Sequence, residues 1–147
     1  MRRALELASL AELQGEVPVG ALIVFNGEII GEGFNAPIST TDPTAHAEVQ
    51  ALRAAAKHLG NYRLGGVTIY ATLEPCIMCA GAIVNSRVQR LVFGARDLRF
   101  GGVRSKFRLA DSDLLNHQVE VVEGVLGAEC TEVLQRFFER KRILKEE

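Results

Sequence analysis

Two short stretches constrain this chain more than any other feature, because both carry zinc-binding residue types and both lie at the start of a predicted helix. They are His46-Ala47-Glu48 and Pro75-Cys76-Ile77-Met78-Cys79. One imidazole and two thiols leave one corner of a zinc tetrahedron open, which distinguishes catalytic zinc from structural zinc. The fold must therefore bring the two stretches together around a single ion.

The spacing within each stretch agrees with such a site. Cys76 and Cys79 are three residues apart, so on a helix they share one face and can hold the same ion. His46 and Glu48 would diverge in mid-helix, but in a first turn they can flank one pocket. Glu48 is then placed to move the protons of a water that zinc acidifies. Hydrolytic removal of an amine from an amidine-like carbon requires this set of groups.

The other cysteine and histidine residues have simpler interpretations. Cys-x-x-Cys also occurs in thioredoxin-like redox pairs, but that alternative leaves His46 and Glu48 without a role. Cys130 lies in a helical pattern, and we expect it to pack as a small apolar residue rather than as a fourth ligand. We interpret His58 and His117 as surface or helix-capping residues.

Length and composition indicate one soluble domain over residues 1–147, with 48% hydrophobic and 24% charged residues. No apolar run approaches the roughly 20 residues that cross a bilayer. The basic start at Arg2 and Arg3 is followed by Glu6 and Glu12, which predicts an amphipathic helix and no signal peptide. We therefore expect a cytoplasmic protein without membrane contact.

Alternating strand and helix patterns predict a three-layer α/β/α fold. Asn26-Gly27 between two apolar runs indicates a hairpin. The expected elements are helices over 4–13, 46–59, 74–85 and 128–145, a shorter helix after residue 95, and strands over 21–25, 28–34, 67–72, 90–95 and 119–122. The predicted fold class is α/β, with a mixed five-stranded sheet that begins as an antiparallel hairpin and continues with parallel strands.

Basic residues are concentrated in one segment of a nearly neutral chain. The formal net charge is −1, yet residues 87–108 hold seven Lys and Arg against Asp97 alone, a local charge of +6. Such a segment is a candidate surface for phosphate groups. A solvated loop and helix face is the alternative, and the charge count alone does not separate the two.

The two zinc-binding stretches together form a known signature. His-x-Glu followed by Pro-Cys-x-x-Cys is the pattern of zinc nucleoside and nucleobase deaminases. Beyond this signature, the chain resembles the bacterial tRNA-specific adenosine deaminases over nearly its full length. The matching stretches are 16–21, 31–35, 42–49, 61–64, 72–82 and 92–97, and the terminal stretch 137–142 matches in kind.

This resemblance implies conversion of adenosine to inosine at the first anticodon position of an arginine tRNA, by a homodimer with one zinc ion per subunit. It also implies that His46, Cys76 and Cys79 ligate zinc and that Glu48 shuttles protons. The residues expected to contact the flipped base or the anticodon stem-loop are Asn35, Ala47, Arg96, Asp97, Phe137 and Phe138. One of the two phenylalanines is expected to pack into the core instead. No DNA partner is expected.

The chain departs from the family pattern after Asp97, where a lysine two places on and then small residues would be expected. Leu98-Arg99-Phe100 stands there instead, which keeps the positive charge but changes the loop. The nearest alternative function is deamination of guanine or another free base, which needs no phosphate surface. A non-catalytic zinc- and tRNA-binding subunit is a further alternative, but it would have no need for Glu48.

Overall fold

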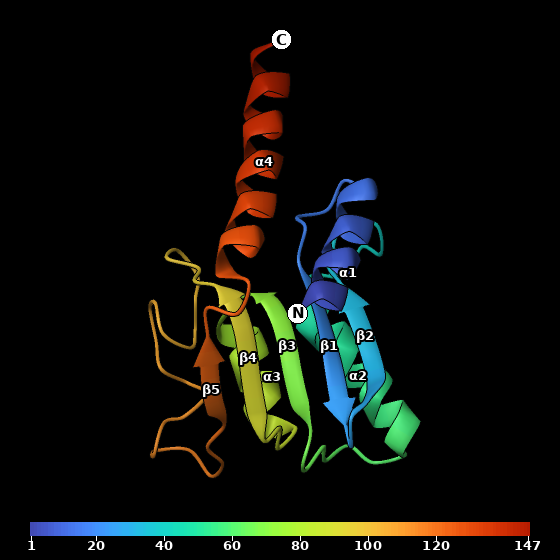
Figure 1. Cartoon of the computed structure of the whole chain (residues 1–147), viewed down its shortest axis with the longest axis vertical. Coiled ribbons are helices and arrows are strands. Elements are labelled where there is room, and N and C mark those ends of the chain that lie inside the picture. The colour runs from blue at the N-terminus through green and yellow to red at the C-terminus, as the bar shows by residue number, and fades with distance from the viewer.

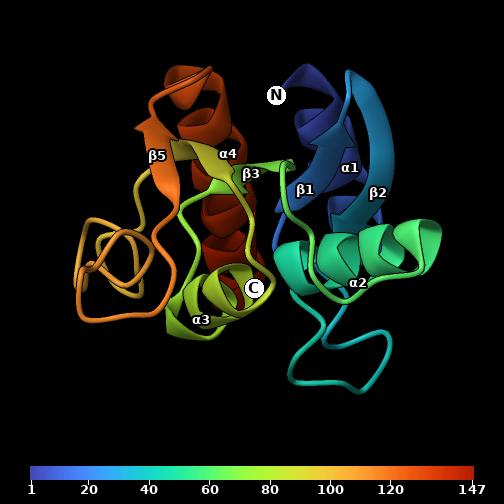
Figure 2. The same ribbon diagram turned by 90° about the horizontal axis from the view of Figure 1, so that it is seen from below.

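The computed structural model describes all 147 residues as one five-stranded sheet between two layers of helices (Figure 1, Figure 2). The elements are α1 (Arg2–Leu13), β1 (Gly20–Phe25), β2 (Glu28–Phe34), α2 (Ala47–Leu59), β3 (Thr68–Leu73), α3 (Ile77–Asn85), β4 (Arg90–Ala95), β5 (Glu120–Glu123) and α4 (Gly127–Glu146). Figure 2 shows α2 and α3 on one face of the sheet and α1 and α4 on the other.

The strand order, β2-β1-β3-β4-β5, places two helix starts at one edge of the sheet. β1 is antiparallel to both β2 and β3, whereas β3, β4 and β5 are parallel. β2 and β3 therefore run in the same direction, and the chain leaves their carboxyl ends to form α2 and α3. The predicted mixed sheet is confirmed, and its carboxyl edge is where both zinc-binding stretches begin.

Most predicted elements are present within one or two residues, and two expectations are wrong. The helix predicted from residue 74 begins at Ile77, because Cys76 is the N-cap and Pro75 lies outside the helix. The shorter helix expected after residue 95 is absent, and residues 96–119 form turns and irregular loop. At the hairpin, Asn26 and Gly27 have φ of 51° and 78°, as the predicted two-residue turn requires.

Glycines in β2 let α2 lie directly on the hairpin. A Cβ atom at Gly31 would lie 2.5 Å from the Ala51 carbonyl oxygen and 2.7 Å from the Ala55 nitrogen. A Cβ at Gly33 would collide with the backbone of Ala47 at the start of the same helix. Both positions accept only a hydrogen side chain, so the close packing fixes where α2 begins and hence where His46 stands.

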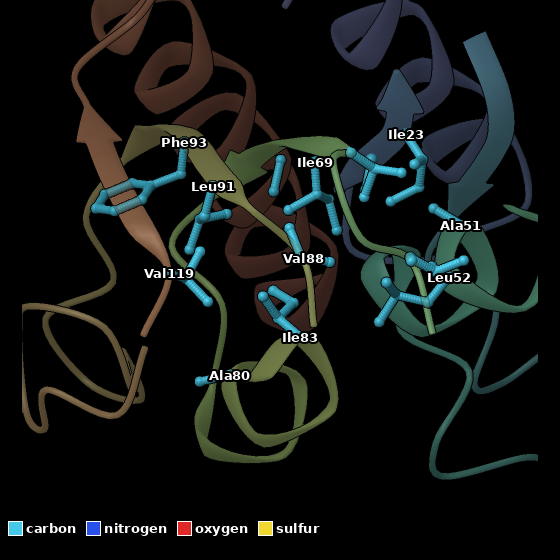
Figure 3. Packing of buried hydrophobic residues seen from close by; sticks show 14 of the residues in the cluster. Ile23, Ala51, Leu52, Ile69, Ala80, Ile83, Val88, Leu91, Phe93 and Val119 are labelled. Carbon is cyan, nitrogen blue, oxygen red and sulfur yellow. The ribbon is translucent and has the colours of Figure 1, made fainter. Parts of the chain in front are cut away.

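The main core lies between the sheet and the α2–α3 layer (Figure 3). Strand residues such as Ile69 and Leu91 pack against Ile83 of α3, and all three are fully buried. On the opposite face, Cys130 of α4 is 1% exposed, and a Cβ at Gly94 would collide with its sulfur. The expectation that Cys130 is a small core residue is confirmed.

The last helix extends beyond the rest of the molecule. α4 begins near the carboxyl ends of β4 and β5 and continues past this edge of the sheet (Figure 1). Along its 20 residues only Cys130 and Phe137 are buried. None of the helices is both long enough and apolar enough to span a membrane.

Candidate active site and metal centre

Two helix N-caps carry the ligand side chains. His46 caps α2 and Cys76 caps α3, and both have extended backbone angles, with φ −76°, ψ 152° and φ −72°, ψ 178°. N-caps are commonly Ser, Thr, Asp or Asn, whose side chains accept hydrogen bonds from helix N–H groups. Neither His46 nor Cys76 makes such a bond, so both side chains are free for another partner.

The free side chains meet Cys79, which lies in the first turn of α3. Nδ1 of His46 is 3.6 Å from Sγ of Cys76 and 3.5 Å from Sγ of Cys79. Zinc–nitrogen and zinc–sulfur bonds of about 2.0 and 2.3 Å, at a tetrahedral angle, place nitrogen and sulfur about 3.5 Å apart. The three atoms, all within 4.8 Å of one another, therefore fit one zinc ion bound through Nδ1.

Protons are distributed unevenly over these three groups. A hydrogen bond from the Cys79 thiol, together with one from His46, lowers the pKa of Cys76 to about 4. The bond to Cys76, aided by burial, raises the pKa of the Cys79 thiol. The hydrogen bond to Cys76 likewise raises the pKa of His46. One thiolate is thus already favoured, and a bound cation would displace the protons held by the other two groups.

Glu48 occupies the second position of α2, one residue beyond Ala47. Its side chain is buried, with 4% exposed, and this burial raises the pKa of the carboxyl above its ordinary value. A carboxyl with a raised pKa can take up and return a proton near neutral pH. Because His46 is the N-cap and not within the helix, the two-residue spacing does not force the two side chains to opposite faces.

Asn35 performs the capping that His46 does not. It follows β2, and its side-chain oxygen accepts the Ala47 N–H at 2.9 Å. Asn35 is half-buried, and its amide nitrogen makes no hydrogen bond within the chain, so the NH2 group remains available as a donor. Ala47 is fully buried, and its N–H is used in this bond.

Glu74 is a buried carboxylate between β3 and the ligand helix, and no motif in the sequence predicted a role for it. Its side chain, 2% exposed, accepts N–H bonds of 2.8–3.1 Å from Asp97, Val103, Arg104 and Ser105, and also the Ser105 hydroxyl. Burial acts to raise the pKa of Glu74, but these hydrogen bonds outweigh it and hold the pKa below its usual value. The only signal in the sequence is an acidic residue directly after a buried strand.

The loop held by Glu74 packs against the start of α3. The Gly102 N–H donates to the Pro75 carbonyl at 2.8 Å, and Gly101 forms an isolated β-bridge with Cys76. A Cβ at Gly102 would lie 2.9 Å from the Ile77 nitrogen. The loop is thus fixed both to the buried carboxylate and to the strand–helix junction that carries the ligands.

Three carboxylates outside residues 87–108 pair with four of the seven cations there, and so neutralise part of the local charge of +6. Arg90 pairs with Glu120, Arg96 with Glu123, Arg104 and Arg108 with Asp111, and Arg87 donates to the carbonyls of Val84 and Asn85. Only Arg99 and Lys106 have neither an acidic partner nor a helix carbonyl. Asp97 also has an internal role, since its side chain accepts the Arg99 and Phe100 N–H groups at 3.1 Å.

Arg99 and Lys106, the two free cations, line a hollow next to the three candidate metal ligands. Its walls are Cys76, Ile77, Met78, Arg99, Phe100, Lys106 and Phe107. The ring of Phe100 is 63% exposed, and the Arg99 guanidinium lies 5.6 Å from its centre. Exposed aromatic and cationic side chains thus stand beside a metal ligand.

The two phenylalanines of α4 differ in burial. Phe137 is 7% exposed and Phe138 is 45% exposed, and their rings meet edge to face at 5.3 Å. The Lys141 ammonium lies 5.5 Å from the Phe137 ring centre. The expectation that one of the pair packs into the core is confirmed for Phe137.

Comparison with known proteins agrees with this geometry. Residues 1–142 match the MafB19-like deaminase family. A tRNA-specific adenosine deaminase from Haemophilus influenzae is 54% identical over 143 residues, which cover 97% of this chain and 83% of that protein. The chain belongs to the tRNA-specific adenosine deaminase family. This membership confirms the resemblance seen in the sequence and the expectation of an enzyme.

Solved structures show how far the likeness to this deaminase family extends. A structure from studies of A-to-I editing by tRNA:A34 deaminases at the wobble position of transfer RNA matches with a TM-score of 0.88 at 40% identity. The match covers 91% of this chain and 97% of that one. A guanine deaminase from Bacillus subtilis matches less completely, with a TM-score of 0.62 at 44% identity over 65% of this chain and 61% of that one.

Proposed function

We propose that this protein converts adenosine to inosine, with release of ammonia, at the first anticodon position of a tRNA, and that tRNA-Arg is the substrate. The geometry at the two N-caps carries the proposal, because three ligand atoms are spaced for zinc and the buried carboxyl of Glu48 lies within hydrogen-bonding reach of one of them, the Cys79 sulfur. Relatives at 54% and 40% identity bear names that refer to this reaction or its enzymes.

His46, Cys76 and Cys79 would hold the zinc ion through one nitrogen and two sulfurs. When bound, zinc supplies the Lewis acidity that makes a water molecule nucleophilic at neutral pH. Two helix N-termini point at the same place, and their partial positive charge favours the thiolates.

Glu48 would act as the proton carrier. Its carboxylate oxygen takes a proton from the attacking water and delivers it to the ring nitrogen beside the attacked carbon. The same oxygen then carries the second proton to the departing amine, so that water and adenosine give inosine and ammonia. Burial suits this role, because the raised pKa of Glu48 lets it alternate between charged and neutral forms.

Asn35 would orient the flipped base. Its oxygen is already bonded to the Ala47 N–H, so the free NH2 group is the donor directed at an acceptor on the base. We retain Ala47 as a proposed contact through its main chain, because its side chain is buried.

Contacts with the anticodon stem-loop are proposed for the loop after β4 and for α4. Arg96 and Asp97 lie at the start of that loop, and both would act there while holding their internal partners Glu123 and the Arg99 N–H. Phe138 is exposed enough to meet RNA, whereas Phe137 supports it from the core. A homodimer and a cytoplasmic location complete the proposal.

The decisive test is to incubate the zinc-loaded protein separately with tRNA-Arg, free guanine and cytidine. We expect inosine at the wobble position and an equal amount of ammonia from tRNA-Arg only. Ammonia from guanine without inosine in tRNA would contradict the proposal and favour the guanine deaminase alternative, to which the structural match with the Bacillus subtilis enzyme points. Light scattering of the same sample tests the homodimer.

A further inference from the structure

The loop of residues 96–108, called the basic loop below, has an anchor that the reaction itself does not use. Glu74 is fully buried, yet its carboxylate contacts neither His46 nor the two thiols in any hydrogen bond, and all its partners lie in residues 97–105. We propose that Glu74 is a positioning residue, which holds this loop so that Arg99 and Lys106 face the RNA beside the metal centre. The inference rests on the proposed function, because it concerns how the same site meets tRNA.

The geometry of the anchor shows why the loop is pre-shaped. Oε2 of Glu74 accepts the N–H groups of Val103, Arg104 and Ser105, and Oε1 accepts the Asp97 N–H and the Ser105 hydroxyl. Five donors from both ends of the loop therefore converge on a single side chain. The loop can take this shape only while both carboxylate oxygens accept.

Glycine packing adds a second, independent constraint on the same loop. A Cβ at Gly101 would collide with the Glu74 carboxylate, and Gly102 is bonded to Pro75. The loop is therefore clamped between the buried carboxylate and the backbone that leads to Cys76. Its position relative to the metal ligands is set before any substrate arrives.

The cations that this clamp positions are the ones without a partner. Of the basic residues in 87–108, Arg99 and Lys106 alone have neither an acidic partner nor a helix carbonyl, and both line the hollow beside Cys76. Phosphate groups of a single strand are the matching chemistry, since they are anionic and regularly spaced. A loop already held in place binds them without the entropy cost of ordering it.

Glu74→Gln removes the clamp while keeping the size of the side chain. The NH2 group of Gln would face N–H donors at one of the two oxygen positions, so at least one backbone N–H loses its acceptor. The matched control is Glu16→Gln. Glu16 is also fully buried and also holds a loop, through Ile38 and Ser39, but that loop contains no Lys or Arg between residues 35 and 46.

The experiment measures zinc content, kcat and KM for tRNA, and stem-loop affinity at several salt concentrations for wild type, Glu74→Gln and Glu16→Gln. For Glu74→Gln we expect one zinc per chain, kcat within about threefold of wild type, and a KM raised about tenfold by the loss of two phosphate contacts. The slope of log affinity against log salt should become shallower by about 1 to 2. Glu16→Gln should keep the wild-type slope.

Three outcomes would overturn the inference. In the first, Glu74→Gln keeps both the KM and the salt slope of an active wild type. In the second, Glu74→Gln lowers kcat with KM unchanged, which would place its effect on the metal centre. In the third, both variants change the slope equally. A wild type that neither forms inosine nor binds tRNA would instead refute the proposed function, and the inference with it.

A second variant protects the test against misfolding of Glu74→Gln. Ser105→Ala removes only the hydroxyl donor to Oε1 and keeps the four N–H bonds. We expect a smaller increase in KM, of about twofold to threefold, again with kcat near the wild-type value. An unchanged KM in a folded Ser105→Ala, combined with an unfolded Glu74→Gln, would count against a positioning role and for a purely structural one.

Discussion

Two loops border the metal centre, and they are built alike but carry different groups. Residues 35–46 are held by the buried carboxylate of Glu16, and residues 97–105 by that of Glu74. The first loop contains no Lys or Arg and runs from Asn35 to His46, whereas residues 96–108 contain five. The one charged residue of the first loop, Asp42, pairs with Arg53 of α2, so we call this loop the neutral loop. The same anchoring device thus supports a neutral loop in one place and a basic loop in the other.

This difference suggests a division of labour. The neutral loop delivers the groups that touch the reacting base, because Asn35 and His46 stand at its two ends. The basic loop delivers cations to a surface beside the site. Changes near the neutral loop should therefore alter kcat, and changes in the basic loop should alter KM and its salt dependence.

The largest effect is expected at Glu48, directly after the neutral loop. Glu48→Gln keeps the size of the buried side chain but cannot carry a proton, so kcat should fall by about 10²- to 10⁴-fold. Zinc content and tRNA affinity should stay close to wild type, since neither depends on this carboxyl. Single-turnover inosine formation measures the rate of the chemical step, elemental analysis the zinc content, and a binding titration the tRNA affinity. A variant that retains a tenth or more of wild-type kcat would refute the proton-carrier role.

The next largest effect is expected for Asn35→Asp, which tests the amide NH2 group of this side chain separately from its oxygen. It keeps an oxygen that accepts the Ala47 N–H but replaces the free NH2 donor by a second oxygen. We expect kcat/KM to fall about 10- to 100-fold, because one hydrogen bond to the base is lost and the new oxygen repels the acceptor atom on the base. The melting temperature should stay within about 2 °C of wild type.

Asn35→Ala is the control, because it removes the donor and the cap together. It should also lower the free energy of unfolding by about 1 kcal/mol. Equal activity of Asn35→Asp and wild type would show that the base is oriented by another group.

The sequence predicted the parts of this site that depend on local pattern. Cys76 and Cys79 share a helix turn, and Asn26-Gly27 sets a hairpin, because both arrangements follow from residues a few positions apart. The approach of His46 to the thiols was predicted as well. In a sheet of this class the carboxyl ends of β2 and β3 share an edge, so two helix starts there must be neighbours.

What the sequence did not reveal depends on partners far apart in the chain. Glu74 bonds to residues 23 to 31 positions away, and no periodicity records such a contact. The charge count of the +6 segment could not distinguish paired from free cations for the same reason, since Glu120 and Glu123, the partners of Arg90 and Arg96, lie beyond its C-terminal end. The absence of the helix expected after residue 95 has the same cause, because four N–H groups of this loop bond to the distant Glu74 side chain instead of to main-chain carbonyl groups.

The pH dependence of stability tests the anchor of the neutral loop. Burial acts to raise the pKa of Glu16, but the hydrogen bonds from Ser39 and Ile38 outweigh it and lower the pKa. A carboxyl with a lowered folded-state pKa stabilises the fold above its unfolded pKa, and this contribution disappears as pH falls through the folded value.

Glu16→Gln should therefore lower the free energy of unfolding by about 1 to 3 kcal/mol at pH 7. The difference from wild type should shrink once the pH falls below about 4.3, the ordinary pKa of a glutamate. Urea unfolding at pH 7, 5 and 3.5 measures it. A difference that stays constant across this range would mean that the charge of Glu16 contributes nothing to the anchor.

The smallest effects are expected for single cations of the basic loop, and they define its role most sharply. Arg99→Ala and Lys106→Ala should each raise KM for tRNA about threefold to tenfold and make the salt slope shallower by about 1, with kcat unchanged. Arg90→Ala is the matched control, because Arg90 is paired with Glu120 at the start of β4, the end of the strand away from the site. Should all three variants weaken binding equally, the RNA would be attracted by the overall charge of the segment, and the distinction between paired and free cations would have no functional meaning.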